Sequence, residues 1–164
     1  MNTRTLSILK PDAVAGPYTG KILSLIEKNG FRIIAMKMLQ FTPIDVIKFY
    51  TIHKDRPFFK NLTLFMTAGP VIVMVLEKEN AVASFRELIG NTDPREAASG
   101  TIRYQFGHSK TRNAIHASDS NENARKEISF FFSEREITDI PYQLPVPEKD
   151  TISRFTGFVI KRYR

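Results

Sequence analysis

Three histidines, His53, His108 and His116, are the residues of this sequence that could supply an uncharged nucleophile near neutral pH. His53 and His108 lie in polar stretches, and an ordinary structural position is favoured for both. His116 precedes a predicted helix start, where free backbone N–H groups attract anions. An imidazole there can meet a phosphate group and attack its phosphorus atom. Residue type and position therefore indicate phosphoryl chemistry at His116.

Other familiar reactive sites are absent from the sequence. It has no cysteine, which excludes a thiol nucleophile, a thiolate zinc site and a disulfide scaffold. His108 and His116 stand without an acidic partner at ligand spacing, so a protein zinc site is not indicated. The glycine patterns of a P-loop, a Rossmann site and a serine hydrolase elbow are missing. A bound nucleotide would therefore be held by separate cationic side chains.

Cationic residues that could hold such a polyanion are spread along the chain. Arginine binds phosphate oxygens through two N–H groups and tolerates the loss of water better than lysine. Each of these residues taken alone is equally typical of a solvated surface. The candidates are Lys10, Arg86, Arg95, Arg103 and Arg112.

Hydrophobic patterning predicts the elements that must position these residues. Strands are predicted at residues 4–9, 31–41 and 71–76, the last of them buried and central. Helices are predicted at residues 22–26, from 43 onward, and at 57–66, 82–89 and 124–131. Thr42, Asn80 and Ser120 are the predicted N-caps of three of these helices.

The segment between the last two predicted helices has little periodicity. Residues 90–119 are predicted as one long functional loop, because loops of that length are otherwise uncommon in a compact domain. The order of strands and helices predicts an α+β sandwich. Spacing alone leaves the direction of strand pairing open.

Length and composition predict a single domain with an extension. The 164 residues divide into a domain at 1–140 and a proline-rich, then basic and apolar, extension at 141–164. The net charge of +7 suits nucleic acid, an anionic membrane or small polyanions, and equally solubility alone. No apolar run approaches the ~18 residues of a membrane span, and no separate apolar signal region is seen. We expect a soluble protein that is not exported.

An ordered set of motifs resembles the nucleoside diphosphate kinase family over residues 4–132. Residues 113–119, NAIHASD, are similar to the family signature N-x-x-H-G-S-D. One such block would be weak evidence, whereas several blocks in the family order are highly specific. The other blocks are KPD at 10–12, RPFF at 56–59, GP at 69–70, GNTDP at 90–94 and GTIR at 100–103.

The resemblance implies a fold and a reaction. The implied fold is α+β and ferredoxin-like, a four-stranded antiparallel sheet covered by helices. The implied reaction is ping-pong transfer of a γ-phosphoryl group from a nucleoside triphosphate to a nucleoside diphosphate through a phosphohistidine. It also implies Mg²⁺ carried by the nucleotide phosphates with no protein side chain as ligand, a cytoplasmic homo-oligomer (tetramer or hexamer), and no membrane partner.

Family roles carry over residue by residue. The catalytic nucleophile would be His116, with Glu127 on its other ring nitrogen and Ser118 in the same hydrogen-bond network. Other implied roles concern the nucleotide: the ribose (Lys10 and Asn113), the phosphates (Arg86, Thr92 and Arg103) and the base (Phe58 by stacking, with Leu62 beside it). Tyr50 would lie close to the histidine and the lysine. Stacking on an aromatic ring tolerates any base, which agrees with a broad nucleotide range.

Three features depart from the family pattern. Ala117 replaces the usual glycine after the histidine, which could shift the His116 backbone. Lys110 stands where an apolar residue near the base is expected, and we favour a solvent-facing side chain there. The extension at 141–164 is longer than the usual tail, and its apolar residues are expected to pack on a subunit. Nucleic-acid binding or a purely structural role are the alternatives, the former motivated by the basic charge and secondary to kinase activity.

Overall fold

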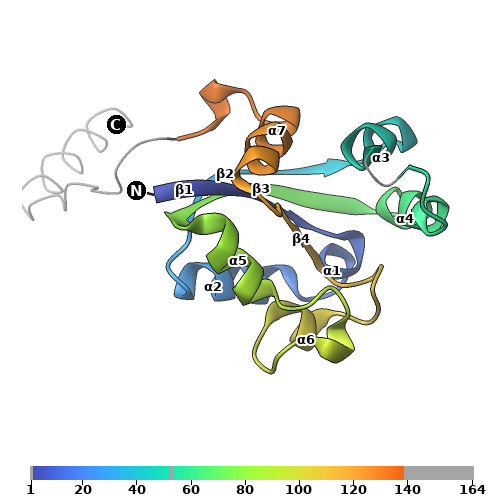
Figure 1. Cartoon of the computed structure of the whole chain (residues 1–164), viewed down its shortest axis with the longest axis horizontal. Coiled ribbons are helices and arrows are strands. Elements are labelled where there is room, and N and C mark those ends of the chain that lie inside the picture. The colour runs from blue at the N-terminus through green and yellow to red at the C-terminus, as the bar shows by residue number, and fades with distance from the viewer. Residues whose placement is uncertain (1, 52–53, 139–164) are drawn as a thin grey trace, which may run out of the picture.

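A four-stranded sheet organises the computed structural model, which describes residues 2–51 and 54–138 (Figure 1). Its strands are β1 (Asn2–Leu9), β2 (Arg32–Gln40), β3 (Pro70–Glu79) and β4 (Ile115–Ala117). The spatial order is β2-β3-β1-β4, and every neighbouring pair is antiparallel. The expected four-stranded antiparallel sheet is therefore confirmed, and the pairing direction that spacing left open is settled.

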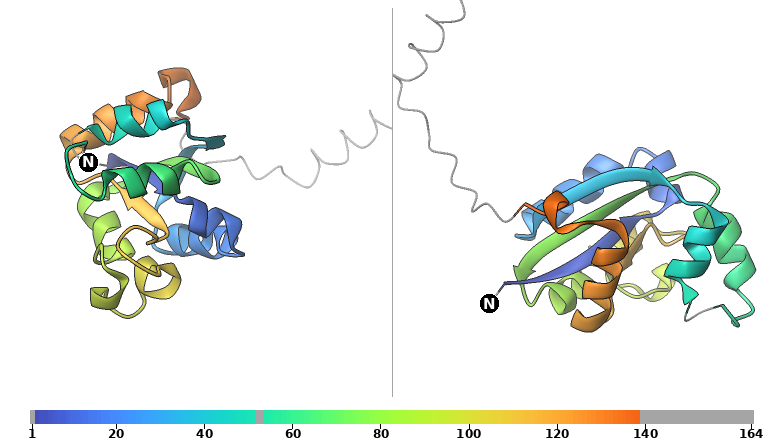
Figure 2. Two further views of the ribbon diagram at one scale, coloured as in Figure 1. Left: turned by 90° about the vertical axis from the view of Figure 1, so that its right-hand side faces the viewer. Right: turned by 90° about the horizontal axis from the view of Figure 1, so that it is seen from above.

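Helices cover both faces of this sheet (Figures 1 and 2). On one face lie α1 (Pro11–Ala15), α2 (Thr19–Lys28), α5 (Ala81–Ile89) and α6 (Ile102–Phe106). On the other lie α3 (Pro43–Phe49), α4 (Phe59–Met66) and α7 (Asn121–Phe131). The described residues also include the short 3₁₀ helices η2 (Pro94–Glu96) and η3 (Glu134–Glu136). The predicted α+β sandwich is confirmed.

The central strand β3 separates two hydrophobic cores. Val71, Val73 and Val75 face the core under α3, α4 and α7. Ile72 and Met74, which alternate with them, face the core under α2 and α5. Because side chains alternate along a strand, a run of apolar residues requires burial on both sides. The prediction of a buried central strand at 71–76 is confirmed, and the strand is longer than predicted.

All three predicted N-cap residues precede a helix, and two of them cap it with a side-chain hydrogen bond. Thr42 and Ser120 each accept a hydrogen bond from the backbone N–H three residues on. Asn80 is the N-cap residue of α5 as predicted, but it has a left-handed backbone with φ 51° and makes no side-chain cap bond. The Ala81 N–H donates to Thr3 Oγ1 instead (2.7 Å), so the neighbouring strand satisfies the helix end.

The predicted long loop at 90–119 is partly ordered secondary structure, so that prediction was too simple. It contains η2, α6 and β4. The last two have five and three residues, too few to show a period in the sequence. The short helix α1 was missed for the same reason. Pairing with β1, a long-range contact, is what makes residues 115–117 a strand. His53 and the extension at 141–164 lie outside the described residues.

Candidate active site

His116 occupies the middle of β4, opposite Ile8 of β1. We expected it immediately before a helix start, and this was wrong because α7 begins only at Asn121. Its neighbours Ile115 and Ala117 belong to the core under α5. Alternation along the strand therefore turns the imidazole to the opposite face, toward α3 and α7. The His116 side chain is 19% exposed, so its neighbours restrict its motion while a ligand can still reach the ring.

A carboxylate fixes the ring of His116. Glu127 on α7 has Oε2 at 3.2 Å from His116 Nε2 and accepts a hydrogen bond from Ser118 Oγ at 2.6 Å. The buried Ser118 hydroxyl in turn accepts from the Leu6 N–H of β1. An ionised carboxylate only accepts hydrogen bonds, so Nε2 carries the hydrogen in this pairing. The lone pair then sits on Nδ1, which makes Nδ1 the nucleophilic atom.

Two aromatic rings of α3 and its C-cap flank the imidazole. The ring centroids of Phe49 and Tyr50 lie 5.4 and 5.9 Å from that of His116, both in edge-on arrangements. Burial, followed by the charge of Glu127, raises the pKa of Tyr50 above its usual value. Its phenol is therefore neutral at physiological pH and is not a base.

Lys10 and Asn113 form a buried polar pair beside this histidine. Lys10 Nζ donates to Asn113 Oδ1 at 2.6 Å and to the Thr111 carbonyl at 3.3 Å. Burial, followed by the nearby Arg103 cation, lowers the pKa of Lys10 to about 8. The Asn113 amide donates to the carbonyls of Thr92 and Lys110. Asn113 thus ties the end of β1 to two loop segments.

A strained residue connects Asn113 to the strand. Ala114 is fully buried and has φ +66°, a left-handed conformation unusual for alanine. Its N–H donates to Asp12 Oδ2 (3.0 Å), and its carbonyl accepts from the Lys10 N–H (2.9 Å). These two bonds fix the turn between Asn113 and His116, both of which line the same cavity. Asp12 lies in the KPD block at 10–12 but had no predicted role.

One arginine of the site is held by backbone carbonyls. Arg103 on α6 donates to the carbonyls of Gly90 (2.9 Å) and Ile115 (3.0 Å). Burial, followed by the neighbouring Arg86 cation, lowers the pKa of Arg103 to about 10. It remains charged at neutral pH. Two cations placed side by side are stabilised when an anion lies between them.

A cavity of about 560 Å³ brings most of the predicted site together. Among its lining residues are His116 and Glu127, together with Lys10, Tyr50, Phe58, Leu62, Arg86, Thr92, Arg103 and Asn113. Ser118 lies beneath it, bonded to Glu127. The candidate cations Arg95 and Arg112 are not among the lining residues, and His108 is exposed. Cations, one aromatic ring and one oriented imidazole in a single cavity suit a nucleotide phosphate and its transfer.

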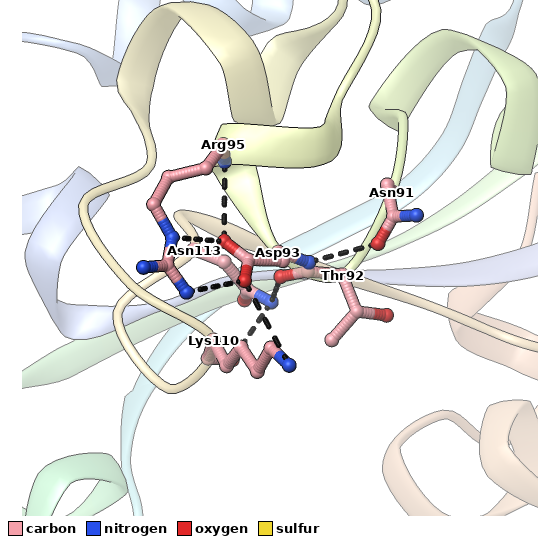
Figure 3. Close-up of polar contacts among 6 residues, drawn as sticks. All are labelled: Asn91, Thr92, Asp93, Arg95, Lys110 and Asn113. Atoms are coloured by element: carbon pink, nitrogen blue, oxygen red, sulfur yellow. Dashed lines mark hydrogen bonds and ion pairs between the residues drawn. The ribbon is translucent and has the colours of Figure 1, made fainter.

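Ala117 and Lys110, the two residues near the histidine that depart from the family pattern, differ in how they fit the structure. Ala117 pairs with Ser7 in the ladder between β4 and β1, so its backbone is extended and needs no glycine. Lys110 is largely exposed, as favoured, yet it also lines the cavity. Its Nζ lies 3.7 Å from Asp93 Oδ2, a carboxylate that Arg95 binds more closely (Figure 3).

Residues 2–51 and 54–138 contain no group of three or more histidine, aspartate or glutamate side chains placed to bind a metal ion. The helices of the same residues include none long and apolar enough to cross a membrane.

Comparisons with known proteins agree on one family. Residues 3–137 match the family model described as nucleoside diphosphate kinase. A nucleoside diphosphate kinase of Nitratiruptor is 61% identical over 134 residues, which are 82% of this chain and 98% of that protein. The solved nucleoside diphosphate kinase of Aquifex aeolicus is 50% identical with TM-score 0.82, over 84% of this chain and all of the other. That of Halobacterium salinarum in complex with CDP is 34% identical with TM-score 0.83, over 87% and 95%.

Proposed function

The chain belongs to the nucleoside diphosphate kinase family, and from that premise we propose that it transfers a γ-phosphoryl group between nucleotides through a phosphohistidine at His116. The observation that carries the assignment is the bond between His116 Nε2 and Glu127. That bond leaves Nδ1 as the nucleophile, in a cavity that Arg86 and Arg103 also line. The same cavity serves the donor and the acceptor in turn, because a covalent relay removes the need to bind both at once.

The reaction divides into two balanced steps. In the first, the Nδ1 lone pair attacks the γ-phosphorus, the N–P bond forms, and the bond to the β–γ bridging oxygen breaks. The nucleoside diphosphate leaves with that oxygen. In the second, a terminal oxygen of another nucleoside diphosphate attacks the same phosphorus and the N–P bond breaks. Glu127 stabilises the positive charge that the ring carries while it is phosphorylated.

The remaining lining residues divide between the parts of the nucleotide. Arg86, Arg103 and Thr92 hold the phosphates, and their charge offsets the charge that develops during transfer. The nucleoside is held by Lys10 and Asn113 at the ribose and by Phe58 and Leu62 at the base. Phe58 is half-exposed at the cavity mouth, a position that suits stacking on any base.

We propose that Mg²⁺ enters with the nucleotide phosphates. The polar groups that line the cavity are mainly cationic and neutral. Its two carboxylates already accept hydrogen bonds, Glu127 from Ser118 and the His116 ring and Asp119 from Asn123. This set suits phosphate oxygens and leaves the metal to the nucleotide. When bound, Mg²⁺ neutralises phosphate charge.

We further propose a cytoplasmic homo-oligomer, a tetramer or a hexamer. The edge strand β2 exposes Met36 and Met38 by 52% and 61%, which supports an interface there. Residues 1–140 would be the kinase domain, and the family match ending at 137 supports the separate nature of 141–164. Nucleoside di- and triphosphates are the partners, with nucleic acid at most a secondary ligand of the +7 chain.

Initial rates test the mechanism. Rates measured with Mg-ATP and dGDP at several fixed concentrations of each are expected to give parallel double-reciprocal lines, the pattern of a ping-pong relay. The variant His116→Gln keeps a polar side chain and is expected to lose transfer altogether. Lines that intersect would mean that both nucleotides bind together, and this result would exclude the relay.

A further inference from the structure

We propose that Lys110 makes this kinase distinguish guanine from adenine nucleotides, by a contact between its ammonium group and the edge of the base. The inference rests on the proposed function, which places the base against Phe58. Stacking on that ring alone accepts any base, since every base has a π-face. Discrimination therefore needs a polar group that reaches the base edge.

Lys110 lines the same cavity as the two residues assigned to the base, Phe58 at the N-cap of α4 and Leu62 within that helix. The segment that carries Lys110 runs beside this helix, because the Arg112 guanidinium lies 5.8 Å from the centre of the Phe65 ring. The lysine and the aromatic ring therefore belong to one region of the site.

The backbone of Lys110 is firmly held. Its carbonyl accepts a hydrogen bond from Asn113 Nδ2 at 3.0 Å. The same Asn113 side chain accepts from the buried Lys10 at 2.6 Å. The turn is closed by His108 N–H donating to the Arg112 carbonyl at 2.7 Å. The side chain of Lys110 thus starts from a fixed point beside the Lys10–Asn113 pair.

The ammonium group of Lys110, in contrast, is weakly held. Within the described residues its one ion-pair partner is Asp93, whose Oδ2 lies at 3.7 Å, beyond hydrogen-bond distance. Arg95 already binds that carboxylate through Nε (3.0 Å) and Nη2 (2.7 Å), and its backbone N–H binds it as well (Figure 3). The Lys110 side chain is 67% exposed. The Asp93 carboxylate is buried and is already paired with Arg95, so a solvated ammonium 3.7 Å away gains little from it and can turn to a ligand at small cost.

The chemistry of the two purines then differs at Lys110. A lysine ammonium has three hydrogen-bond donors and no acceptor. Guanine presents two acceptors, O6 and N7, on one edge, and lysine is a frequent partner of that pair. Adenine presents N7 beside an amino group, which is a donor and repels the ammonium. A contact between the Lys110 ammonium and the base edge therefore favours guanine over adenine.

Binding of GDP and ADP to the full-length chain tests the inference without requiring turnover. Titration calorimetry with Mg²⁺ present is expected to show GDP bound about three- to tenfold more tightly than ADP, the range of one partly solvated charged hydrogen bond. Lys110→Met keeps the length of the side chain and removes the donors, and it is expected to bring the two affinities together. Lys110→Arg is expected to keep the preference.

Arg112→Met is the matched control. It removes an exposed cation from the same turn, and Arg112 neither contacts Asp93 nor belongs to the cavity-lining residues. Its GDP-to-ADP ratio is expected to equal that of the wild type. Equal affinities in the wild type, a ratio that survives Lys110→Met, or an equal loss in Arg112→Met would each overturn the inference. Failure of the proposed function has a different signature: both nucleotides bind with their ratio intact, but no phosphoenzyme forms.

Discussion

Glu127 accepts hydrogen bonds from His116 and Ser118 on the same carboxylate oxygen, Oε2. Two donors on one oxygen keep the carboxylate in place while it orients the ring. The reactive Nδ1 thus depends on a residue that never touches phosphorus. Orienting partners of this kind are typically worth 10- to 100-fold when removed, as with the carboxylates behind metal-bound histidines.

Glu127→Gln is therefore expected to lower kcat by about 10- to 100-fold with little change in KM. The amide has nearly the shape of the carboxylate but lacks the charge that stabilises the phosphorylated ring. Steady-state kinetics with Mg-ATP and dGDP measure kcat and KM separately. Ser118→Ala removes the support of Glu127 and the acceptor of the Leu6 N–H but leaves the carboxylate on the ring, and it is expected to have a smaller effect on kcat. A Glu127→Gln variant with wild-type kcat would contradict the role assigned to the carboxylate.

The depressed pKa of Lys10 makes nucleotide binding depend on pH. Burial lowers this pKa to about 8, so the side chain loses its proton as the pH rises through 8. Only the charged form attracts the nucleotide. We expect ADP affinity to fall above about pH 8, while Lys10→Arg, which stays charged, keeps affinity to higher pH. Calorimetric titrations from pH 6.5 to 9.5 measure both, and a flat wild-type profile would contradict the prediction.

The same shift has a consequence for folding stability. The unfolded chain holds this proton up to its ordinary pKa near 10.5, whereas the folded chain releases it near 8. Between those values the unfolded state binds more protons, so the contribution of Lys10 to stability rises with pH. Below pH 8 the cost of burying the charge is present in full.

At the scale of elements, the short strand β4 carries the reacting residue and is one of the short elements that the sequence pattern did not reveal. Strands of apolar residues such as β3 can be recognised because burial repeats along them. β4 has only three residues, and its pairing with β1 joins positions more than a hundred residues apart. Local patterns cannot contain that contact.

The two alanines around His116 allow a matched test of this strand. Ala117 is extended and buried, so Ala117→Gly is expected to lower the free energy of unfolding by about 1 kcal/mol. Ala114 has φ +66°, a conformation that glycine adopts without strain, so Ala114→Gly is expected to cost clearly less. Urea denaturation measures both. Equal losses would contradict the role of backbone strain at Ala114.

The site as a whole was more predictable than the elements that build it. The family motifs carry the chemistry, so His116, Lys10, Asn113 and the arginines could be named from the sequence. Neither the left-handed Ala114 nor its bond to Asp12 could be named, because both depend on how β1 and β4 meet. The Lys110–Asp93 contact was missed for the same reason, since it joins two loops.

At the scale of the whole molecule, the two cores place the site at the end of the sheet beside α3 and α4. β1 contributes Lys10 just after its last residue, β4 contributes His116, and α7 contributes Glu127. These elements come from both ends of the described chain. The site is therefore complete only when β4 has paired with β1 and α7 has packed beside them.

The extension at 141–164 is predicted to matter at this scale. Phe155, Phe158 and Val159 are apolar residues in a basic segment, and such residues are seldom left wholly in water. Deletion of 141–164 is expected to lower the melting temperature or the oligomer mass, measured by calorimetry and light scattering against the full chain. If both values stay unchanged, the extension does not pack on a subunit.

Formation of a phosphoenzyme tests the central claim most directly. The intact mass of the wild-type chain, recorded after mixing with Mg-ATP, is expected to increase by one phosphoryl group, and addition of GDP is expected to remove it. His116→Ala, which lacks the nucleophile, is expected to show no increase under the same conditions. A wild-type chain that transfers phosphate without ever gaining mass, or a His116→Ala chain that gains it, would contradict the assignment of His116.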